Sequence, residues 1–238
     1  MTATATAGRP PARRAVPRPG PVYGIADLAA LGGLAPAAAA AAMARAGVSW
    51  VQLRAKGVDD AELHRHALEC RRALDGTGAR LWLDDRPDVA ALAGADGVHV
   101  GQDDLPPAAA RRVVGPGAWI GRSTHDREQL LAADRDPEVD VIAVGPVFPT
   151  RGKDRPDPVV GLDFVRWARA ATAKPLVAIG GIDETNLAAV LAAGADAAAV
   201  LSAVCGTRGR EGDLTGREAE VEANAARLVA AAREAERS

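Results

Sequence analysis

The chain has 238 residues, of which 48% are hydrophobic and 25% charged, and its formal net charge is −2. These values are typical of a globular protein, and the length fits one α/β barrel domain, which runs to about 200 to 250 residues. The near-neutral charge and the 3% aromatic content argue against a nucleic-acid binder, and no apolar run reaches the roughly 18 residues of a membrane helix.

The first 20 residues differ in composition from the rest of the chain. They contain four arginines, four prolines and no acidic residue. Because such a segment cannot bury enough apolar surface to offset the entropy of ordering, we expect residues 1–20 to be a disordered tail. We expect residues 21–238 to form the folded domain.

From Pro21 onward, short apolar runs alternate with segments of helical periodicity. Eight runs are expected strands: 22–26, 50–54, 80–83, 97–100, 119–121, 139–144, 175–179 and 197–201. Segments whose apolar spacing suits helices are 35–46, 61–74, 106–114, 128–134, 162–173 and 184–193. A polar loop, 207–216, precedes an expected closing helix over 217–237.

This alternation predicts an α/β fold, a single (β/α)8 TIM barrel. The apolar runs show little period-two alternation, which is typical of parallel strands buried on both faces. The alternative is an open doubly wound sheet, but no Gly-x-Gly-x-x-Gly follows the first strand. Ala-Gly-Ala-Asp occurs at 93–96 and at 193–196, each time just before a strand. We interpret its glycine as a helix end in the left-handed conformation.

The carboxyl end of the second strand has three polar residues in register. Ligands of a parallel barrel meet the carboxyl ends of the strands. Gln52, Arg54 and Lys56 are spaced by two and therefore project from one face of an extended chain. Two cations and an amide on an inward face indicate a polyanionic ligand.

The ends of the third and fourth strands have carboxylates. Asp85 and Asp104 are 104 − 85 = 19 residues apart, which is one βα unit. Adjacent strands could therefore bring them together around a hard cation, and Mg²⁺ prefers one or two carboxylates completed by water and phosphate oxygens. We expect Asp103 to cap the helix that starts near Pro106, which leaves Asp104 for the metal.

The remaining strand ends predict anion sites. Thr150, Gly152 and Lys153 lie in a long loop after the sixth strand, and Gly180-Gly181 and Leu201-Ser202 follow the seventh and eighth.

The sequence contains no motif for a protein nucleophile or for zinc. His64 and His66 are expected to face solvent, and His99 is expected to be a hydrogen-bonded core residue. No Ser, His and Asp grouping and no zinc-type spacing occurs, so covalent catalysis is not indicated. Cys70 and Cys205 give no disulfide framework, which favours a cytoplasmic protein.

Taken together, the strand ends resemble those of the thiamine phosphate synthase family from about Tyr23 to Cys205. The motifs are Val51-Gln52-Leu53-Arg54-x-Lys56, Asp85-Arg86, Gly97-Val98-His99-Val100-Gly101-Gln102-x-Asp104-Leu105-Pro106, Gly121-x-Ser123-Thr124-His125, Gly145-Pro146-x-Phe148-Pro149-Thr150-x-x-Lys153 and Ala178-Ile179-Gly180-Gly181-Ile182. Their order and spacing make the resemblance far more specific than any single motif.

The resemblance implies a transferase that joins 4-amino-5-hydroxymethyl-2-methylpyrimidine diphosphate to 4-methyl-5-(2-hydroxyethyl)thiazole phosphate. The products are thiamine phosphate and pyrophosphate. The residues implied to hold the pyrimidine diphosphate are Gln52, Leu53, Arg54, Ala55, Lys56, Asp84, Ser123 and Lys153, of which Arg54, Lys56, Ser123 and Lys153 are the expected catalytic residues. Those implied to hold the thiazole phosphate are Thr150, Arg151, Gly152, Gly181, Leu201 and Ser202. Asp85 and Asp104 would bind one Mg²⁺ per site.

Two positions depart from the family pattern. Asp84 stands where Asn is usual and adds a negative charge near the diphosphate, and Ala55 stands where Glu is common, on the side that should face away from the site.

Two other functions stay open: a thiazole tautomerase of the same fold, and a non-catalytic protein that binds thiamine phosphate. The expected partners are small-molecule substrates, with no nucleic acid and no membrane, and a homo-oligomer stays open.

Overall fold

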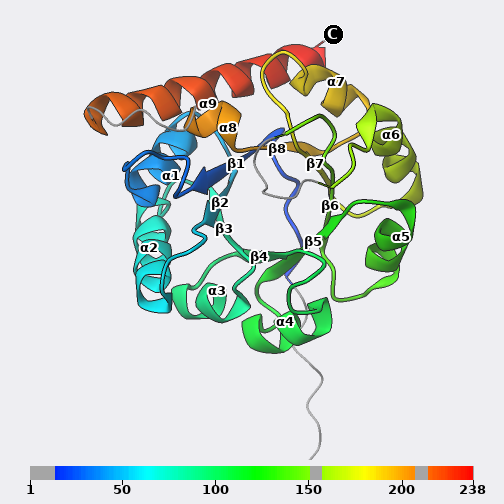
Figure 1. The fold of residues 1–238 in the computed structure, drawn as a ribbon, viewed down its shortest axis with the longest axis horizontal. Helices are drawn as coiled ribbons and strands as arrows, with labels where there is room; N and C mark the ends of the chain where they lie inside the picture. Colours follow the sequence, from blue (N-terminus) through cyan, green and yellow to red (C-terminus); the bar gives the residue numbers. More distant parts are fainter. Residues whose placement is uncertain (1–13, 151–156, 207–213, 238) are drawn as a thin grey trace, which may run out of the picture.

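Each of the eight apolar runs forms a strand of one closed barrel (Figure 1). The computed structural model describes residues 14–150, 157–206 and 214–237. The strands are β1 (Val22–Asp27), β2 (Trp50–Arg54), β3 (Arg80–Asp84), β4 (Gly97–Val100), β5 (Trp119–Thr124), β6 (Val141–Val144), β7 (Leu176–Ile179) and β8 (Ala197–Val200). They pair in parallel and in chain order, and β8 closes on β1. The predicted TIM barrel is confirmed, and the open-sheet alternative is excluded.

Helices surround the barrel between successive strands (Figure 1). They are α1 (Pro36–Arg45), α2 (Asp60–Ala73), α3 (Pro87–Ala93), α4 (Pro107–Val114), α5 (Arg127–Arg135), α6 (Gly161–Ala171), α7 (Leu187–Ala192), α8 (Ser202–Cys205) and α9 (Leu214–Arg237). Sequence periodicity did not find α3 and α8, because seven and four residues are too few to show a helical period. The closing helix begins at Leu214, inside the predicted polar loop. Within the described residues, no helix is long and apolar enough to cross a membrane.

Aromatic side chains fill the barrel interior. Tyr23, Trp50, Trp82 and Trp119 form one buried cluster, in which the ring centroids of Trp50 and Trp82 are 4.8 Å apart. Gly97 makes this packing feasible, because a Cβ there would lie 2.5 Å from the ring of Trp82. The same inward positions continue along each strand towards its carboxyl end, so the polar residues that follow the rings face the barrel mouth.

The amino ends of the strands are joined by a contact that recurs at every second unit. Asp96, Asp140 and Asp196 each stand before a strand, and each accepts a hydrogen bond from the first or second backbone N–H of the preceding strand. Each also pairs with an arginine of the helix one unit back: Arg71 of α2, Arg111 of α4 and Arg169 of α6. We call these three contacts the floor clasps. The Ala-Gly-Ala-Asp regularity therefore does more than end a helix.

The predicted tail boundary needs a correction, because residues 14–20 lie against this floor. The guanidinium of Arg14 lies 4.2 Å from the centre of the Trp119 ring and 3.0 Å from Asp96 Oδ1. Val16 packs on the barrel interior, and the Gly20 N–H donates to Ser49 Oγ at 2.8 Å. Composition predicted disorder here because it cannot show that Trp119 and Asp96 present a cation site. Residues 1–13 lie outside the described residues.

Removal of a floor clasp is expected to destabilise the barrel. Asp196→Ala should lower the free energy of unfolding by about 1.5 to 3 kcal/mol, because it strips a charged acceptor from Arg169 and from the Leu176 N–H. Urea titration followed by tryptophan fluorescence measures the change. Asp163→Ala is the matched control, since the Asp163 side chain is 99% exposed and its pair with Arg166 should contribute nothing measurable. Equal midpoints for both variants would contradict the role of the clasp.

Candidate active site at the carboxyl ends of the strands

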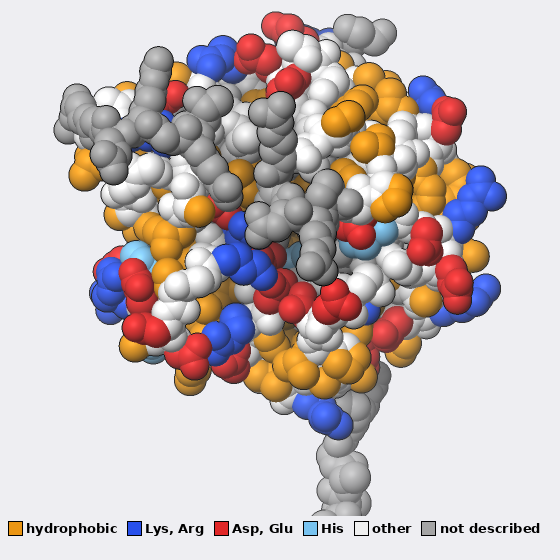
Figure 2. Space-filling model, in the orientation of Figure 1, with side chains coloured by type: hydrophobic (Ala, Val, Ile, Leu, Met, Phe, Trp, Pro, Cys, Tyr) orange, Lys and Arg blue, Asp and Glu red, His pale blue; other side chains and the backbone are white. Residues whose placement is uncertain are grey.

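Four of the predicted site residues form one network of charges at the barrel mouth. The Arg54 Nε lies 3.4 Å from Asp84 Oδ2, and the Lys56 Nζ lies 3.5 Å from the same oxygen. Lys56 also pairs with Asp85. Figure 2 looks onto this end of the barrel, where basic and acidic side chains gather near the centre. The spacing of Gln52, Arg54 and Lys56 predicted this common face, and the contacts confirm it.

Asp27 at the end of β1 belongs to this network, and the sequence analysis missed it. Its side chain is 2% exposed, pairs with Arg54 and accepts a hydrogen bond from the Ala30 N–H at 2.9 Å. Tyr23 and Ile25 face the barrel interior, so the same spacing of two would have placed Asp27 at the mouth. A buried carboxylate on the inner side of Arg54 fixes the direction in which the guanidinium points.

Gln52 lies deeper in the barrel than the ion pairs. Its Nε2 donates to the Tyr23 hydroxyl at 3.0 Å, and both side chains are buried. Burial raises the pKa of Tyr23 well above its ordinary value, against the lowering effect of the bond from Gln52. The phenol is therefore neutral, and the pair makes the bottom of the mouth polar but uncharged.

The backbone turns sharply at Asp85, directly after β3. Asp85 has φ of 59°, a left-handed conformation that is uncommon for a residue other than glycine. The Arg86 N–H donates to the Asp84 carbonyl at 2.8 Å, and the Asp85 N–H donates to the His99 carbonyl at 2.8 Å. Such a conformation costs on the order of 1 to 3 kcal/mol and is concentrated at functional sites. The turn directs Asp84 and Asp85, two consecutive carboxylates, to the same lysine.

Burial raises the pKa of Asp84 above its ordinary value. The cations of Lys56 and Arg54 oppose this rise, and the charge of Asp104 adds to it. Asp104 is therefore close enough to Asp84 for the two carboxylates to repel one another.

This shift predicts a pH-dependent effect of Asp84→Asn on stability. The folded protein binds the Asp84 proton more tightly than the unfolded chain does, so ionisation lowers the free energy of unfolding. This loss of stability begins as pH rises through the pKa of Asp84 in the unfolded chain, which is about 3.9. It is complete above the raised pKa that Asp84 has in the folded protein. Relative to wild type, Asp84→Asn should thus be more stabilising at neutral pH than near pH 4. Urea titrations at both pH values test this, and an advantage that does not grow with pH would refute it.

Asp104 lies in the loop after β4, and its carboxylate is held by the backbone of that loop. Its Oδ2 accepts a hydrogen bond from the Gly101 N–H at 2.7 Å. The prediction that Asp103 caps the next helix is wrong: α4 has Pro106 at its N-cap and no side-chain cap, and Asp103 is exposed. The N-cap position is occupied by Pro106, whose side chain has no acceptor, so the helix starts without a side-chain cap.

Ser123 lies on β5 itself, because that strand extends to Thr124 and not only to 121. Its Oγ lies 2.8 Å from His99 Nε2. His99 thus faces the barrel mouth, and the space beside its ring depends on Gly121, where a Cβ would lie 2.4 Å from Nδ1. The expected hydrogen bond of His99 is confirmed, and its partner is a predicted site residue.

Leu53 and Ala55 face the helices rather than the mouth. The Leu53 side chain is buried in the outer core, and Ala55 packs against the same core. The alternation that brings Gln52, Arg54 and Lys56 inward turns these two outward. Any contact they make with a substrate would therefore come from their backbone.

The opposite side of the mouth is built from the ends of β6, β7 and β8. Gly180 and Gly181 have φ of 103° and 66°, and a Cβ on Gly181 would lie 2.6 Å from the Pro149 carbonyl oxygen. The Phe148 N–H donates to the Gly180 carbonyl at 2.9 Å, so the loop after β6 rests on the glycine pair. Leu201 packs on the barrel interior, and Ser202 begins α8. Thr150 is the last described residue before the gap, and Arg151, Gly152 and Lys153 lie outside the described residues.

His66 differs from its prediction. Its side chain is 8% exposed, and it lies between Glu62 and Glu69 at 3.5 and 3.6 Å. Leu63, Ala67 and Cys70 share its face of α2 at helical spacing, which places the imidazole in the interface with the barrel. It lies on the outer ring and takes no part in the mouth.

The carboxylates at the mouth are suitable ligands for a magnesium ion. Among the described residues, no group of three or more His, Cys, Asp or Glu side chains forms a ready metal cluster. Mg²⁺, however, typically takes one or two carboxylates together with substrate phosphate oxygens and water. Asp85 and Asp104 have the hard carboxylate oxygens that Mg²⁺ prefers, and a cation would relieve the repulsion between Asp84 and Asp104.

Comparison with known proteins assigns the chain to a family. A family model described as thiamine monophosphate synthase matches residues 22–204. The chain belongs to the thiamine monophosphate synthase family. The match covers all eight strands and confirms the resemblance seen at the strand ends.

Individual members of the thiamine monophosphate synthase family show the same similarity. A thiamine-phosphate synthase of Koribacter versatilis is 52% identical over 156 residues, which is 66% of this chain and 73% of that protein. One of Methanoculleus marisnigri is 44% identical over 172 residues, 72% of this chain and 79% of that protein. The solved thiamine phosphate pyrophosphorylase from Pyrococcus furiosus has a TM-score of 0.77 at 30% identity and covers 90% of this chain and 96% of its own.

Proposed function

We propose that the barrel mouth joins the pyrimidine diphosphate to the thiazole phosphate and releases thiamine phosphate and pyrophosphate. One observation supports this most: Arg54 and Lys56 meet Asp84 and Asp85 in one network at the mouth of a barrel of this family. A tautomerase acting on the thiazole alone needs neither the cations nor the carboxylates. The synthase uses both.

The reaction needs no protein nucleophile. The bond between the pyrimidine methylene carbon and the diphosphate oxygen breaks, and both electrons leave with pyrophosphate. The thiazole nitrogen then forms a bond to the resulting cationic carbon, so no proton has to be transferred. Catalysis reduces to holding two reactants in line and stabilising the charge that grows on the leaving group.

Most of the predicted site residues have a part in this proposal, whereas the Leu53 and Ala55 side chains face away from the mouth. Arg54, Lys56 and Lys153 would neutralise the departing diphosphate, and the Ser123 hydroxyl would donate to it. Gln52, at the uncharged bottom of the mouth, would orient the pyrimidine. Asp84, in place of the usual Asn, holds Arg54 and Lys56 on the same side of the mouth.

One Mg²⁺ bound by Asp85 and Asp104 would add positive charge beside the leaving pyrophosphate. Lys56 pairs with Asp85 in the structure, and we propose that it turns to the diphosphate when both substrate and cation are present. Asp85 would then be free to serve as a ligand.

The thiazole phosphate would lie on the side of the mouth formed by β6, β7 and β8. The residues proposed to hold it are Thr150, Arg151, Gly152, Gly181, Leu201 and Ser202. At Gly181 the backbone approaches the loop so closely that no side chain fits. A glycine there leaves backbone N–H groups accessible to a phosphate.

We also propose that the protein works in the cytoplasm with small molecules as its partners. Both cysteines are buried free thiols, and burial raises the pKa of each to about 12. Neither cysteine is in a disulfide, so the fold does not depend on an oxidising compartment.

The deciding experiment mixes the purified protein with both phosphorylated precursors, with Mg²⁺ or with EDTA, and follows the products by chromatography. We expect thiamine phosphate and pyrophosphate in equal amounts, and only with Mg²⁺. The variant Cys70→Ser serves as the control and should keep the wild-type rate, since Cys70 lies on α2 away from the mouth. Tight binding of a precursor without products would refute the synthase and favour the tautomerase or the binding protein.

A further inference from the structure

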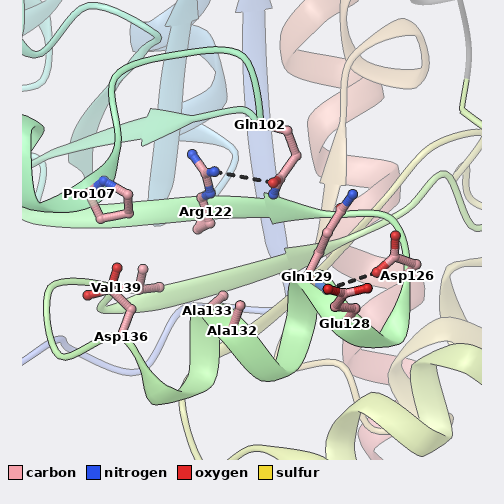
Figure 3. Close-up of a pocket in the computed structure, with 10 residues that line it drawn as sticks. All are labelled: Gln102, Pro107, Arg122, Asp126, Glu128, Gln129, Ala132, Ala133, Asp136 and Val139. Carbon is pink, nitrogen blue, oxygen red and sulfur yellow. Dashed lines mark hydrogen bonds between the residues drawn. The ribbon is translucent and has the colours of Figure 1, made fainter.

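Arg122 lies next to the candidate site but points away from it. It is the fourth residue of β5, directly before Ser123, and successive strand residues face opposite sides. Its side chain therefore lies between the barrel and its helices, in a groove of about 400 Å³ lined also by Gln102, Asp126 and Asp136. Figure 3 shows Arg122 and Gln102 joined by a hydrogen bond on one side of this groove.

Its hydrogen bonds go to the loop that follows β4. The Arg122 Nη1 donates to the Gly101 carbonyl at 2.5 Å, and Nη2 donates to Gln102 Oε1 at 3.2 Å. Gln102 in turn donates from Nε2 to the Ser123 carbonyl at 2.5 Å. Two hydrogen bonds thus tie the loop to two consecutive residues of β5, Arg122 and Ser123.

This loop also sets the position of a proposed magnesium ligand. The carbonyl of Gly101 accepts from Arg122, and the N–H of the same residue donates to Asp104 Oδ2 at 2.7 Å. Two consecutive hydrogen bonds therefore connect the guanidinium to the Asp104 carboxylate. Because Gly101 has no side chain to fix its backbone by packing, these bonds determine how the loop is held.

Acidic side chains surround the Arg122 guanidinium. Burial lowers the pKa of Arg122, and the charges of Asp104 and Asp136 oppose this lowering only in part. Asp126 and Glu128 also line the groove. A planar group with several fixed donors can hold a carbonyl and an amide at the same time, which a lysine ammonium does less well.

We propose that Arg122 is a positioning residue that fixes the loop after β4 and thereby orients the Asp104 carboxylate towards the divalent cation. The inference rests on the proposed function in that Asp104 is taken as a cation ligand. Partners that orient metal ligands typically change metal affinity by about 10- to 100-fold when they are removed.

The test measures cation binding apart from turnover. Mn²⁺ is titrated into the full-length protein with inorganic pyrophosphate present, and free Mn²⁺ is followed by electron paramagnetic resonance. Arg122→Ala should weaken Mn²⁺ binding by about 10-fold or more, and Arg122→Lys should lie between this variant and wild type. The Mg²⁺ concentration for half-maximal rate should rise in parallel, with the KM for thiazole phosphate unchanged.

Arg111→Ala is the matched control, because Arg111 is also a partly buried arginine and donates to three backbone carbonyls, those of Gly115, Ala118 and Glu138. It lies at the amino ends of the strands, so it should lower stability without changing Mn²⁺ affinity. Wild-type Mn²⁺ affinity in Arg122→Ala, or an equal loss in Arg111→Ala, would overturn the proposal.

A second variant guards against a failure to fold. Gln102 is exposed, so Gln102→Ala should fold normally, remove one arm of the tether and weaken Mn²⁺ binding to a smaller extent. If Arg122→Ala does not fold and Gln102→Ala binds Mn²⁺ as wild type does, the proposal is also overturned.

The outcomes distinguish this inference from the proposed function. If wild type binds Mn²⁺ in an Arg122-dependent manner but makes no thiamine phosphate, the proposed function fails and this inference stands. If the protein makes thiamine phosphate but Arg122→Ala leaves Mn²⁺ binding unchanged, the proposed function stands and this inference fails.

Discussion

Asp104→Ala is expected to lower turnover by at least ~10²-fold at saturating substrate, because the growing charge on pyrophosphate loses its stabilising cation. Steady-state rates with both precursors and excess Mg²⁺ measure this loss. The carboxylate has one further contact, from the Gly101 N–H, so loss of that bond has to be separated from loss of the cation. Asp104→Asn does so, since its amide oxygen still accepts from Gly101 but lacks the charge. It should lose nearly as much turnover as Asp104→Ala.

Asp103 provides the matched control for Asp104. It is the adjacent carboxylate on the same loop, it is exposed, and α4 has no side-chain cap. Asp103→Ala should therefore keep both the wild-type rate and the wild-type dependence on Mg²⁺. Near wild-type turnover in Asp104→Ala, or an equal loss in Asp103→Ala, would show that the cation is bound elsewhere or is not needed.

The barrel and most of its mouth could be predicted because both depend on local periodicity. Parallel strands buried on both faces need uninterrupted apolar runs, and the chain shows eight of them. A spacing of two then placed Gln52, Arg54 and Lys56 on one face without any knowledge of the tertiary fold. The same rule places Asp27 on the inner face with Tyr23 and Ile25, but no second polar residue in register marks this position, because Ala29 follows two residues later.

What sequence could not predict depends on contacts between distant residues. Arg14 meets Trp119 and Asp96 across more than 80 positions, and composition alone made its segment look disordered. His66 looked like a surface residue because its neighbours in sequence are charged, yet the face of α2 towards the barrel includes it. The tether from Arg122 joins a side chain of β5 to the backbone carbonyl of Gly101, and backbone partners leave no mark in a sequence.

Arg54 is expected to contribute to both stability and turnover, and its buried partner allows the two to be separated. The Asp27 side chain is 2% exposed and pairs with Arg54, which is 22% exposed. Arg54→Ala leaves this carboxylate buried without a cation, and removal of one member of such a pair typically costs about 3 to 5 kcal/mol. Turnover should fall by at least ~10²-fold as well, because a cation beside the leaving diphosphate is lost.

The double variant Asp27→Asn with Arg54→Gln tests whether these two effects have different causes. It removes both charges and keeps polar groups that can hydrogen bond, so most of the lost unfolding free energy should return. Turnover should stay low, because the diphosphate still lacks its cation. Arg45→Ala is the control, since Arg45 pairs with Glu218 and Glu222 on an exposed surface far from the mouth and should change neither quantity. Recovery of turnover together with stability in the double variant would mean that Arg54 holds the barrel mouth together and has no direct part in the chemistry.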